Sequence, residues 1–358
     1  MRNNLNSYFF SIRTIAILAM VFATAFLYHI LFVLPVLAQT EVQNTRTDGM
    51  LLQRNHHQIE IVAEELPDGQ IAYRIIKFIT TDINNRTIDV TPTYGSEPTI
   101  PGPTLIFQEG DTVRVTLFNN IGWGMISIHP HGIHYNITSD GTLSAVNGVS
   151  DQGATPENPI TYQWSAGSGT VGTWPYHDHT LGITPSGRDV EGLEKVGLFG
   201  TLIVNPANGK VNALINGSPK EIDLQDIKQD FILYVTDDAF WGMEIDNTKG
   251  NKQQIPLWVN PTLVSANNDI VRFHVIALGS DFHDFRLDKY QWLKPGTNQI
   301  INKQTIGPLE SHVFSISTNT NATYFDEIQL HLLSGMKGKF NVNTNGGGPS
   351  IPGISPLS

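Results

Sequence analysis

Four of the chain's 12 histidines form two H-x-H pairs, His129-Pro130-His131 and His177-Asp178-His179. On a strand, residues i and i+2 point to the same face, so each pair presents two imidazoles side by side. If the two strands are neighbours, four neutral nitrogen ligands converge, which suits copper, zinc or iron. Single H-x-H pairs occur by chance, but two within one predicted domain favour a metal site. Asp178 is expected to point to the opposite face and to support its strand.

The elements that would position these histidines are predicted to be β-strands. Residues 112–117 alternate apolar and polar side chains over six positions, which is the pattern of a strand with one face in water. Turn formers bracket this segment at Gly110-Asp111 and Asn119-Asn120. No long segment beyond the N-terminus has a convincing helical period, so the chain is predicted to be all-β.

The predicted strands recur as a twofold internal repeat. Residues 111–115 (DTVRV) return as 269–273 (DIVRF), and residues 176–179 (YHDH) return as 324–327 (YFDE). Each half then closes on a similar segment, at 197–200 and 335–338. The alignment predicts two β-sandwich domains at 50–205 and 226–343, joined by a polar linker at 206–225. Residues 344–358, rich in Gly, Pro and Ser, are expected to form a flexible tail.

Charge and cysteine content exclude several classes of protein. The formal net charge is −11, which argues against nucleic acid or an anionic membrane surface as the main partner. Cysteine is absent. The chain therefore has no disulfide, iron–sulfur cluster or thiol nucleophile, and it cannot form a blue-copper centre, which needs a thiolate ligand.

The N-terminal segment is typical of export. Arg2 and Arg13 precede an uncharged run from Thr14 to Leu34, and Val36-Leu37-Ala38 fits a signal peptidase site. We expect residues 1–38 to be a signal peptide, or alternatively an uncleaved membrane anchor, since the run is long enough to cross a bilayer. Either outcome places the remainder outside the cytoplasm, secreted, periplasmic or on the outer cell surface, with membrane contact only through this segment.

The first histidine pair lies in a longer recognisable pattern. The segments Pro101–Leu105, Glu109–Val115 and Ile128-His129-Pro130-His131-Gly132 together resemble the first domain of multicopper oxidases, and 172–179 (GTWPYHDH) resembles their second histidine motif. The similarity covers nearly all of residues 50–343. It implies two Greek-key cupredoxin domains in tandem, as in two-domain laccase-like oxidases and copper nitrite reductases. It also implies copper as the cofactor and a homotrimer with copper sites between subunits.

The resemblance assigns roles to individual residues. His129 falls on a type 2 copper position, and His131, His177 and His179 fall on type 3 positions. The type 1 positions are His283, Asp326, His331 and Met336, so a carboxylate replaces the family's cysteine. The second domain's share of the trinuclear cluster is Arg286, Asp288, Phe325 and Glu327, none of which is a histidine.

These departures remove the thiolate route by which the family passes electrons to its cluster. The type 1 positions are expected either to bind a metal as a colourless type 2-like centre or to remain as packed core residues. Asp288 and Glu327 are candidate oxygen ligands. Arg286 disfavours a cation and is expected to pair with one of these carboxylates or to bind an anionic substrate. His134 is a candidate support for His131, whereas the histidines at 56, 57, 274 and 312 are interpreted as structural.

Three functions remain open from the sequence. The first is an exported copper oxidoreductase that reduces dioxygen or a small nitrogen oxide, with electrons from a small-molecule donor or a partner cupredoxin, and is not an ordinary blue-copper laccase. The second is a non-catalytic extracytoplasmic copper-binding protein for storage, delivery or tolerance. The third is a structural cupredoxin module that assembles with another exported protein. The resemblance favours the first, while the residues themselves leave the first two close.

Overall fold

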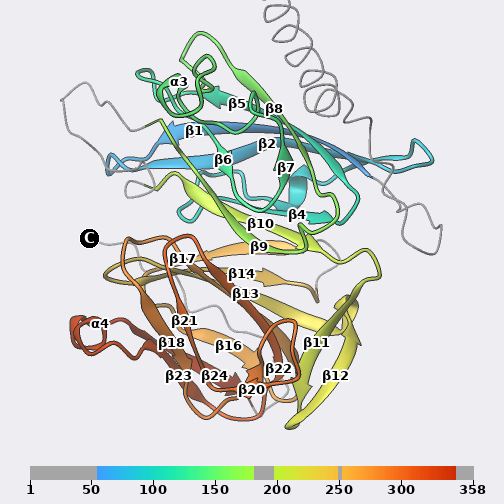
Figure 1. Ribbon diagram of the computed structural model, residues 1–358, viewed down its shortest axis with the longest axis vertical. Helices are drawn as coiled ribbons and strands as arrows, with labels where there is room; N and C mark the ends of the chain where they lie inside the picture. The colour runs from blue at the N-terminus through green and yellow to red at the C-terminus, as the bar shows by residue number, and fades with distance from the viewer. Residues whose placement is uncertain (1–54, 181–196, 249–251, 344–358) are drawn as a thin grey trace, which may run out of the picture. The chain divides into compact units, whose positions relative to one another are not determined.

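The computed structural model describes residues 55–180, 197–248 and 252–343 (Figure 1). The predicted export segment at 1–38 and tail at 344–358 lie outside these residues. Within the described ranges, no helix combines the length and apolar character that a membrane crossing requires. Almost all regular structure is β, as predicted from the period-2 alternation.

The first half forms a β-sandwich of two sheets. Its strands are β1 (His56–Glu65), β2 (Ile71–Thr81), β3 (Thr87–Asp89), β4 (Thr104–Gln108), β5 (Thr112–Asn119), β6 (His129–Pro130), β7 (His134–Tyr135), β8 (Ile160–Ser165), β9 (Gly172–His177) and β10 (Phe199–Asn205). Six of them pair in the order β3-β2-β1-β5-β8-β7, and four in the order β4-β10-β9-β6. The 3-10 helix η2 (Thr91–Thr93) and the short helix α3 (Ser144–Asn147) lie in connections.

The second half repeats this plan with a larger first sheet. Its strands are β11 (Lys210–Ile215), β12 (Ser218–Asp223), β13 (Ile227–Val235), β14 (Phe240–Asp246), β15 (Gln253–Leu257), β16 (Leu263–Ala266), β17 (Ile270–Ala277), β18 (His283–Leu287), β19 (Trp292–Leu293), β20 (Ile300–Ile301), β21 (Lys303–Ile306), β22 (Ser311–Ser317), β23 (Ala322–Asp326) and β24 (Lys337–Asn343). The sheet orders are β12-β11-β22-β17-β13-β14-β15, β16-β24-β23-β18-β21 and β19-β20. The 3-10 helix η4 (Leu224–Asp226) precedes β13, and helix α4 (Gln329–Ser334) follows β23.

Strand pairing reproduces the internal repeat. β5 pairs in parallel with β1 and antiparallel with β8, while β17 pairs in parallel with β13 and antiparallel with β22. The closing glycines are equivalent as well. A Cβ at Gly200 would lie 2.3 Å from the Tyr176 hydroxyl, and one at Gly338 would lie 2.1 Å from the Tyr324 hydroxyl. Each glycine therefore makes room for the tyrosine of the neighbouring strand, which explains why both repeats end on the same pattern.

The segment predicted to be a linker, 206–225, contains the hairpin β11–β12. β11 joins the seven-stranded sheet by pairing with β22. The hairpin is held because Ala213 and Ile222 are buried together with Ile227 in a small apolar cluster. Polar residues on the other positions gave this segment the composition of a linker.

Apolar packing joins the two sandwiches. Phe199 and Ile203 of β10 are buried in one cluster with Ile232, Tyr234 and Ile276 of the second sandwich. Because β10 pairs with β9, this packing fixes the sheet that carries β9 against the second domain and holds the histidine-bearing strand in place.

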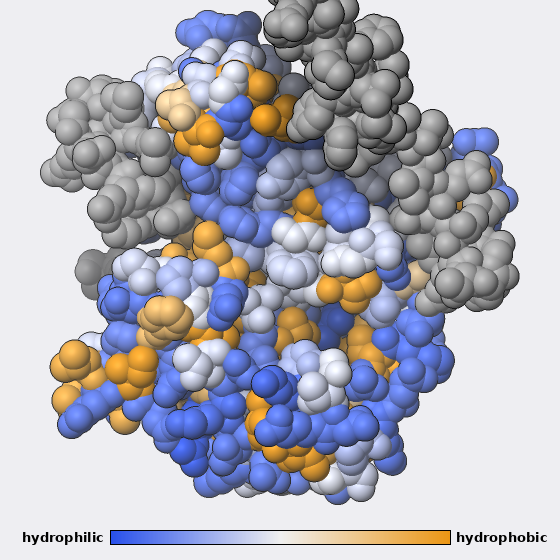
Figure 2. Space-filling view, viewed as in Figure 1, coloured by the Kyte–Doolittle hydropathy of each residue, from blue (hydrophilic) through white to orange (hydrophobic). Residues whose placement is uncertain are grey.

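Helix α4 carries a separate exposed apolar group. Its members are Leu330 and Leu333, both 76% exposed, and Figure 2 shows apolar atoms gathered where α4 lies.

Candidate metal centre

The two H-x-H pairs lie on neighbouring strands. β6 pairs antiparallel with β9 so that His129 lies opposite His177, and the backbone N–H of His131 donates to the Pro175 carbonyl. The ring centroid of His129 is 4.8 Å from that of His131, 5.7 Å from His177 and 5.0 Å from His179. The structure therefore brings together all four histidines that the spacing singled out.

Two of the four rings face each other through their Nε2 atoms. The Nε2 atoms of His131 and His177 are 3.1 Å apart. Two nitrogens that each lie about 2.0 Å from one metal at a tetrahedral angle are about 3.3 Å apart. The spacing of these two atoms thus fits a shared metal ion as well as it fits a hydrogen bond.

Backbone carbonyls fix the tautomers of two rings. Nδ1 of His129 donates to the Asp140 carbonyl, and Nδ1 of His177 donates to the Asp178 carbonyl at 2.8 Å. With the proton on Nδ1, each Nε2 keeps its lone pair for a metal, and such outer contacts orient imidazole ligands in metal sites. In His179, Nδ1 is buried and has no hydrogen-bond partner among the described residues. An unpaired buried nitrogen beside three imidazoles is a donor that a metal would satisfy.

The surroundings keep the rings of His129 and His131 neutral. Burial, together with repulsion between the neighbouring imidazoles, lowers the pKa of His129 to about 4 and that of His131 to about 3. A neutral imidazole is the ligating form. These two residues therefore present lone pairs to a metal throughout the neutral pH range.

Asp178 supports the strand end, as expected from its position between the two histidines. Its buried carboxylate accepts the backbone N–H of Ser127 at 2.6 Å and that of Thr180 at 3.0 Å. The Ser127 hydroxyl in turn accepts the backbone N–H of His179 at 2.9 Å. Burial raises the pKa of Asp178, which these hydrogen bonds partly offset. The carboxylate thereby orders the turn that carries His177 and His179.

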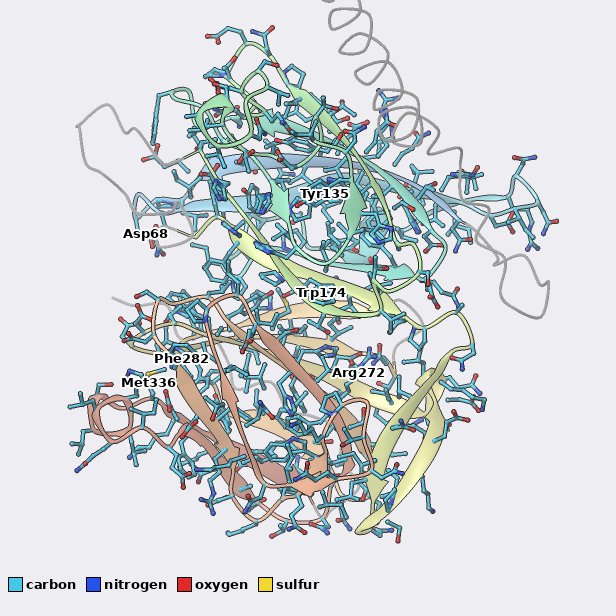
Figure 3. The ribbon with its side chains drawn as sticks, viewed as in Figure 1. Asp68, Tyr135, Trp174, Arg272, Phe282 and Met336 are labelled. Atoms are coloured by element: carbon cyan, nitrogen blue, oxygen red, sulfur yellow. The ribbon has the colours of Figure 1, made fainter. Side chains whose placement is uncertain are left out.

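Trp174 of the second motif packs against Gly132 of the first, where only a glycine leaves room for its ring. Gly132 has φ +62°, and a Cβ there would lie 1.9 Å from the Trp174 ring, which packs in its place. Tyr135 on β7 lies with its ring 6.2 Å from that of His129, and Figure 3 shows Tyr135 and Trp174 in the first sandwich. Tyr135 was not singled out from the sequence, where His134 was the candidate support, and the structure leaves both side chains exposed.

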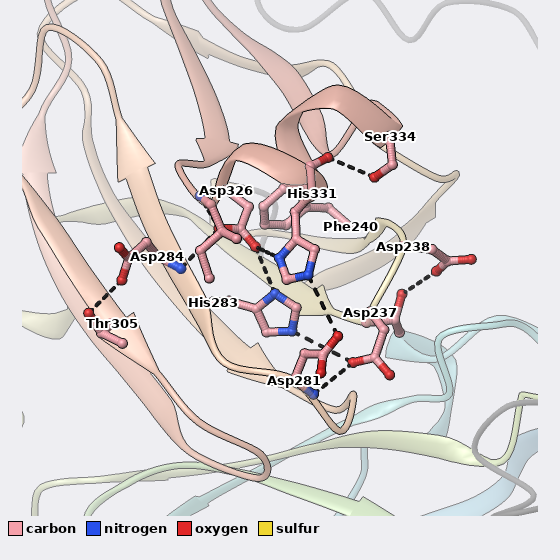
Figure 4. A network of polar contacts seen from close by, with 12 residues as sticks. Asp237, Asp238, Phe240, Asp281, His283, Asp284, Thr305, Asp326, His331 and Ser334 are labelled. Atoms are coloured by element: carbon pink, nitrogen blue, oxygen red, sulfur yellow. Dashed lines mark hydrogen bonds and ion pairs between the residues drawn. The ribbon is translucent and has the colours of Figure 1, made fainter.

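The second domain brings His283 and His331 together around the carboxylate of Asp326 (Figure 4). Oδ2 of Asp326 accepts Nδ1–H of His283 at 2.8 Å and of His331 at 2.6 Å, while Oδ1 accepts the backbone N–H groups of Asp284 and Ile328 at 3.0 Å each. Burial raises the pKa of Asp326, but these hydrogen bonds outweigh it and hold the pKa below its usual value. Four hydrogen bonds thus hold this carboxylate between the two imidazoles, and the ligand atoms of His283, Asp326 and His331 all lie within 4.8 Å of one another.

Met336 is fully buried within the apolar core of the second domain, so it packs as a core residue. Its backbone N–H donates to the His331 carbonyl at 3.1 Å, and its carbonyl accepts the backbone N–H of Asp326 at 3.2 Å. Figure 3 labels it beside Phe282 in the second sandwich.

Two of the second domain's remaining cluster positions, Arg286 and Glu327, pair with each other. Arg286 forms an ion pair with Glu327, which also pairs with Lys303 at 3.0 Å. Asp288 accepts the backbone N–H of Thr323 at 2.7 Å. Of the expected partners, Arg286 takes Glu327. Among the other histidines, His274 bonds Asp230 and Thr173.

Comparisons with known proteins find relatives of this chain. The multicopper oxidase family model matches residues 77–209. A probable nitrite reductase-hydroxylamine oxidoreductase fusion protein of Kuenenia stuttgartiensis is 28% identical over 258 residues, which cover 69% of this chain and 28% of that protein. An L-ascorbate oxidase of Cucurbita maxima is 37% identical over 112 residues, 31% of this chain and 17% of that protein. The chain thus spans less than a third of either curated relative.

A solved structure of a multicopper oxidase has the same fold, with a TM-score of 0.51 and 20% identity over 84% of this chain and 92% of that one. The two sandwiches are accordingly cupredoxin-like, as the resemblance implied. Residues 77–209 form a multicopper oxidase domain, and the kinship with that family read from the histidine motifs, with copper as its implied cofactor, is confirmed.

Proposed function

We propose that this chain is a copper-binding oxidoreductase whose metal is held by His129, His131, His177 and His179. The observation that carries the proposal is the convergence of these four imidazoles, with two Nε2 atoms 3.1 Å apart and an unpaired buried Nδ1 on His179. The donor set is all nitrogen, which suits copper. When bound there, copper would supply a redox centre that also acts as a Lewis acid.

The protein's own groups prepare the site before any metal arrives. The carbonyls of Asp140 and Asp178 hold protons on Nδ1 of His129 and His177 and so aim the Nε2 lone pairs inward. Asp178 and Ser127 fix the turn that bears His179. These contacts reduce the reorganisation that ligand binding requires.

Electrons must reach this centre by a route other than a thiolate. Asp326 stands at the cysteine's position and its oxygens are filled by four hydrogen bonds. We infer that a small-molecule donor or a partner cupredoxin supplies electrons at the first-domain centre, and that dioxygen or a small nitrogen oxide such as nitrite accepts them. The matches to an ascorbate oxidase and to a probable nitrite reductase fusion protein support these two acceptor classes.

A second candidate is copper binding without turnover, for storage, delivery or tolerance. The same Asp326 arrangement favours it, because a chain without the thiolate route can retain copper without an electron supply. For both candidates we propose export through residues 1–38 and assembly as a homo-oligomer, a trimer by family resemblance.

Turnover separates the two candidates. We would load the full chain with copper and measure consumption of oxygen and of nitrite with a small reductant. The variants His129→Ala/His177→Ala and, as a control, His134→Ala on β7 in the other sheet would be tested alongside. Steady turnover that the double variant loses and the control keeps supports the oxidoreductase. Copper retained without turnover favours the storage function, and equal turnover in all three proteins contradicts this site.

A further inference from the structure

The second domain holds a histidine pair whose Nε2 atoms lie on the side away from Asp326. His283 begins β18 and His331 lies in α4, with ring centroids 5.0 Å apart. Both Nδ1 atoms donate to Oδ2 of Asp326. The tautomers are therefore fixed with hydrogen on Nδ1, which leaves a lone pair on each Nε2.

Asp326 has the same structural task as its counterpart in the first repeat. Asp178 accepts the backbone N–H groups of Ser127 and Thr180, and Asp326 accepts those of Asp284 and Ile328, the aligned positions. Its additional bonds to two imidazoles make it a positioning carboxylate of the kind that orients histidine ligands from behind.

The Nε2 atoms point toward two further carboxylates. Nε2 of His283 is fully buried and has no hydrogen-bond partner among the described residues, and its nearest carboxylate oxygen is Oδ1 of Asp237 at 3.9 Å. Nε2 of His331 lies 3.6 Å from Oδ2 of Asp281. These separations exceed the roughly 3.3 Å between two ligands of one tetrahedral metal by about 0.6 and 0.3 Å.

The two carboxylates are held together and remain accessible. Oδ1 of Asp237 accepts the backbone N–H of Asp281 at 3.0 Å, and Oδ2 accepts the Ser280 hydroxyl at 2.8 Å. In the part of the chain that the structure describes, neither acid forms an ion pair with a lysine or arginine. The Asp281 side chain is 60% exposed, and Asp237 lines a cavity of about 390 Å³ that also touches Trp241 and Leu278. An ion can reach the group from solvent.

We propose that Nε2 of His283 and His331, with the carboxylates of Asp237 and Asp281, bind a divalent transition-metal ion, for which zinc(II) is the probe. Mixed imidazole and carboxylate donors suit such an ion. The site is separate from the four-histidine centre and uses neither Asp326 nor Met336 as a ligand. Asp326 positions both rings.

Zinc titration of the full chain tests the ligand set. We would compare the native chain with Asp237→Asn/Asp281→Asn and with the control Asp238→Asn/Asp284→Asn, which changes the charge equally. The proposal expects the first variant to bind one zinc ion fewer per chain, or that ion about 10-fold or more weakly, while the control matches the native chain. Equal binding by all three proteins overturns it.

A second measurement on the unaltered chain does not depend on how the variants fold. In ¹⁵N-histidine NMR spectra, zinc should shift the Nε2 resonances of two histidines that retain their Nδ1 protons, in addition to any change in the first-domain cluster. Loss of the Nδ1 protons of His283 and His331, or no response from either ring, would overturn the proposal. Copper content at the four-histidine centre is read separately, so failure of either site is distinguishable from failure of the other.

Discussion

At the scale of single residues, one carboxylate in each repeat orders the turn that carries the histidines. Asp178 and Asp326 occupy aligned positions after equivalent strands, and each accepts two backbone N–H groups across the turn. In the first domain this orders two imidazoles of the metal centre. In the second, the same carboxylate also fixes His283 and His331.

Asp178→Asn should therefore destabilise the chain. An asparagine amide offers one acceptor atom where two oxygens now serve, so a buried N–H of Ser127 or Thr180 loses its partner. The expected loss is about 2 kcal/mol in the free energy of unfolding, measured by denaturant titration. Asp151→Asn, whose exposed carboxylate accepts the Ser144 N–H, is the control and should change it by less than about 1 kcal/mol. Equal losses would contradict this role.

A buried histidine outside both sites predicts the pH response. Nε2 of His312 accepts the Trp292 indole N–H at 2.7 Å, and burial lowers the pKa of His312 to about 4. The unfolded chain takes up this proton near pH 6.5. The neutral His312 therefore contributes up to about 3 kcal/mol to the free energy of unfolding above pH 6.5, and this contribution is lost as the pH falls toward 4. Unfolding titrations across this range should show a shallower pH slope for His312→Gln, and an unchanged slope would refute the assignment.

At the scale of elements, the metal centre depends on how β6 and β9 meet. The strands pair His129 with His177, and the Trp174 ring fills the space that a side chain at residue 132 would need. The centre is therefore a product of two short strands and the turn residue between β6 and β7.

Gly132→Ala should disturb this junction through sterics. A Cβ at residue 132 would overlap the Trp174 ring, whereas one at Gly148, which has a similar φ of +75°, would meet open space. We expect Gly132→Ala to lower the free energy of unfolding by about 2 kcal/mol more than Gly148→Ala, since overpacking adds to the shared backbone strain. Copper affinity should fall only in the first variant. Equal losses of stability in the two variants would show that the positive φ, and not the contact with Trp174, causes the effect.

At the scale of the whole molecule, a buried polar network ties the sandwiches together. Asp230 of β13 accepts Nε–H of Arg272 at 2.5 Å and contacts Nε2 of His274 at 3.0 Å. These partners reach the first sandwich, where Arg272 donates to Asn205 at 3.0 Å and His274 contacts the Thr173 hydroxyl at 2.6 Å. Burial raises the pKa of Asp230, but the Arg272 charge and the His274 hydrogen bond outweigh it and lower that pKa strongly.

Asp230→Asn should consequently weaken the contact between domains. It leaves the Arg272 guanidinium buried without its counter-charge, which costs about 3–5 kcal/mol. The exposed pair of Asp223 with Lys210 is the control, and Asp223→Asn should cost less than about 1 kcal/mol. Calorimetry of both variants checks the difference. A small effect in Asp230→Asn would show that apolar packing alone joins the domains.

Much of this architecture could be predicted from sequence because it is local or repeated. Alternation predicted the strands, and the recurrence of residues 111–115 at 269–273 predicted the two sandwiches, whose pairing agrees. The H-x-H spacing predicted that His129 and His177 would meet. The second-domain group could not be predicted in this way. It joins segments up to 94 residues apart in the sequence, from 237 to 331, and depends on the orientation of two imidazole rings, which residue spacing does not encode. The residues concerned are His283, His331, Asp237 and Asp281. The hairpin at 210–223 was missed because its second strand, Ser218–Asp223, buries Ile222 alone and is otherwise exposed or half-buried, which gives it the composition of a linker.

The most direct test of the central claim is the copper content of the copper-loaded full chain, by elemental analysis, with an electron paramagnetic resonance spectrum of the same sample. We predict about one copper ion or more per chain with a type 2 signal, lost in His129→Ala/His177→Ala and preserved in His134→Ala. A chain that stays free of copper after loading, or one whose copper and signal survive in the double variant, would contradict the four-histidine centre.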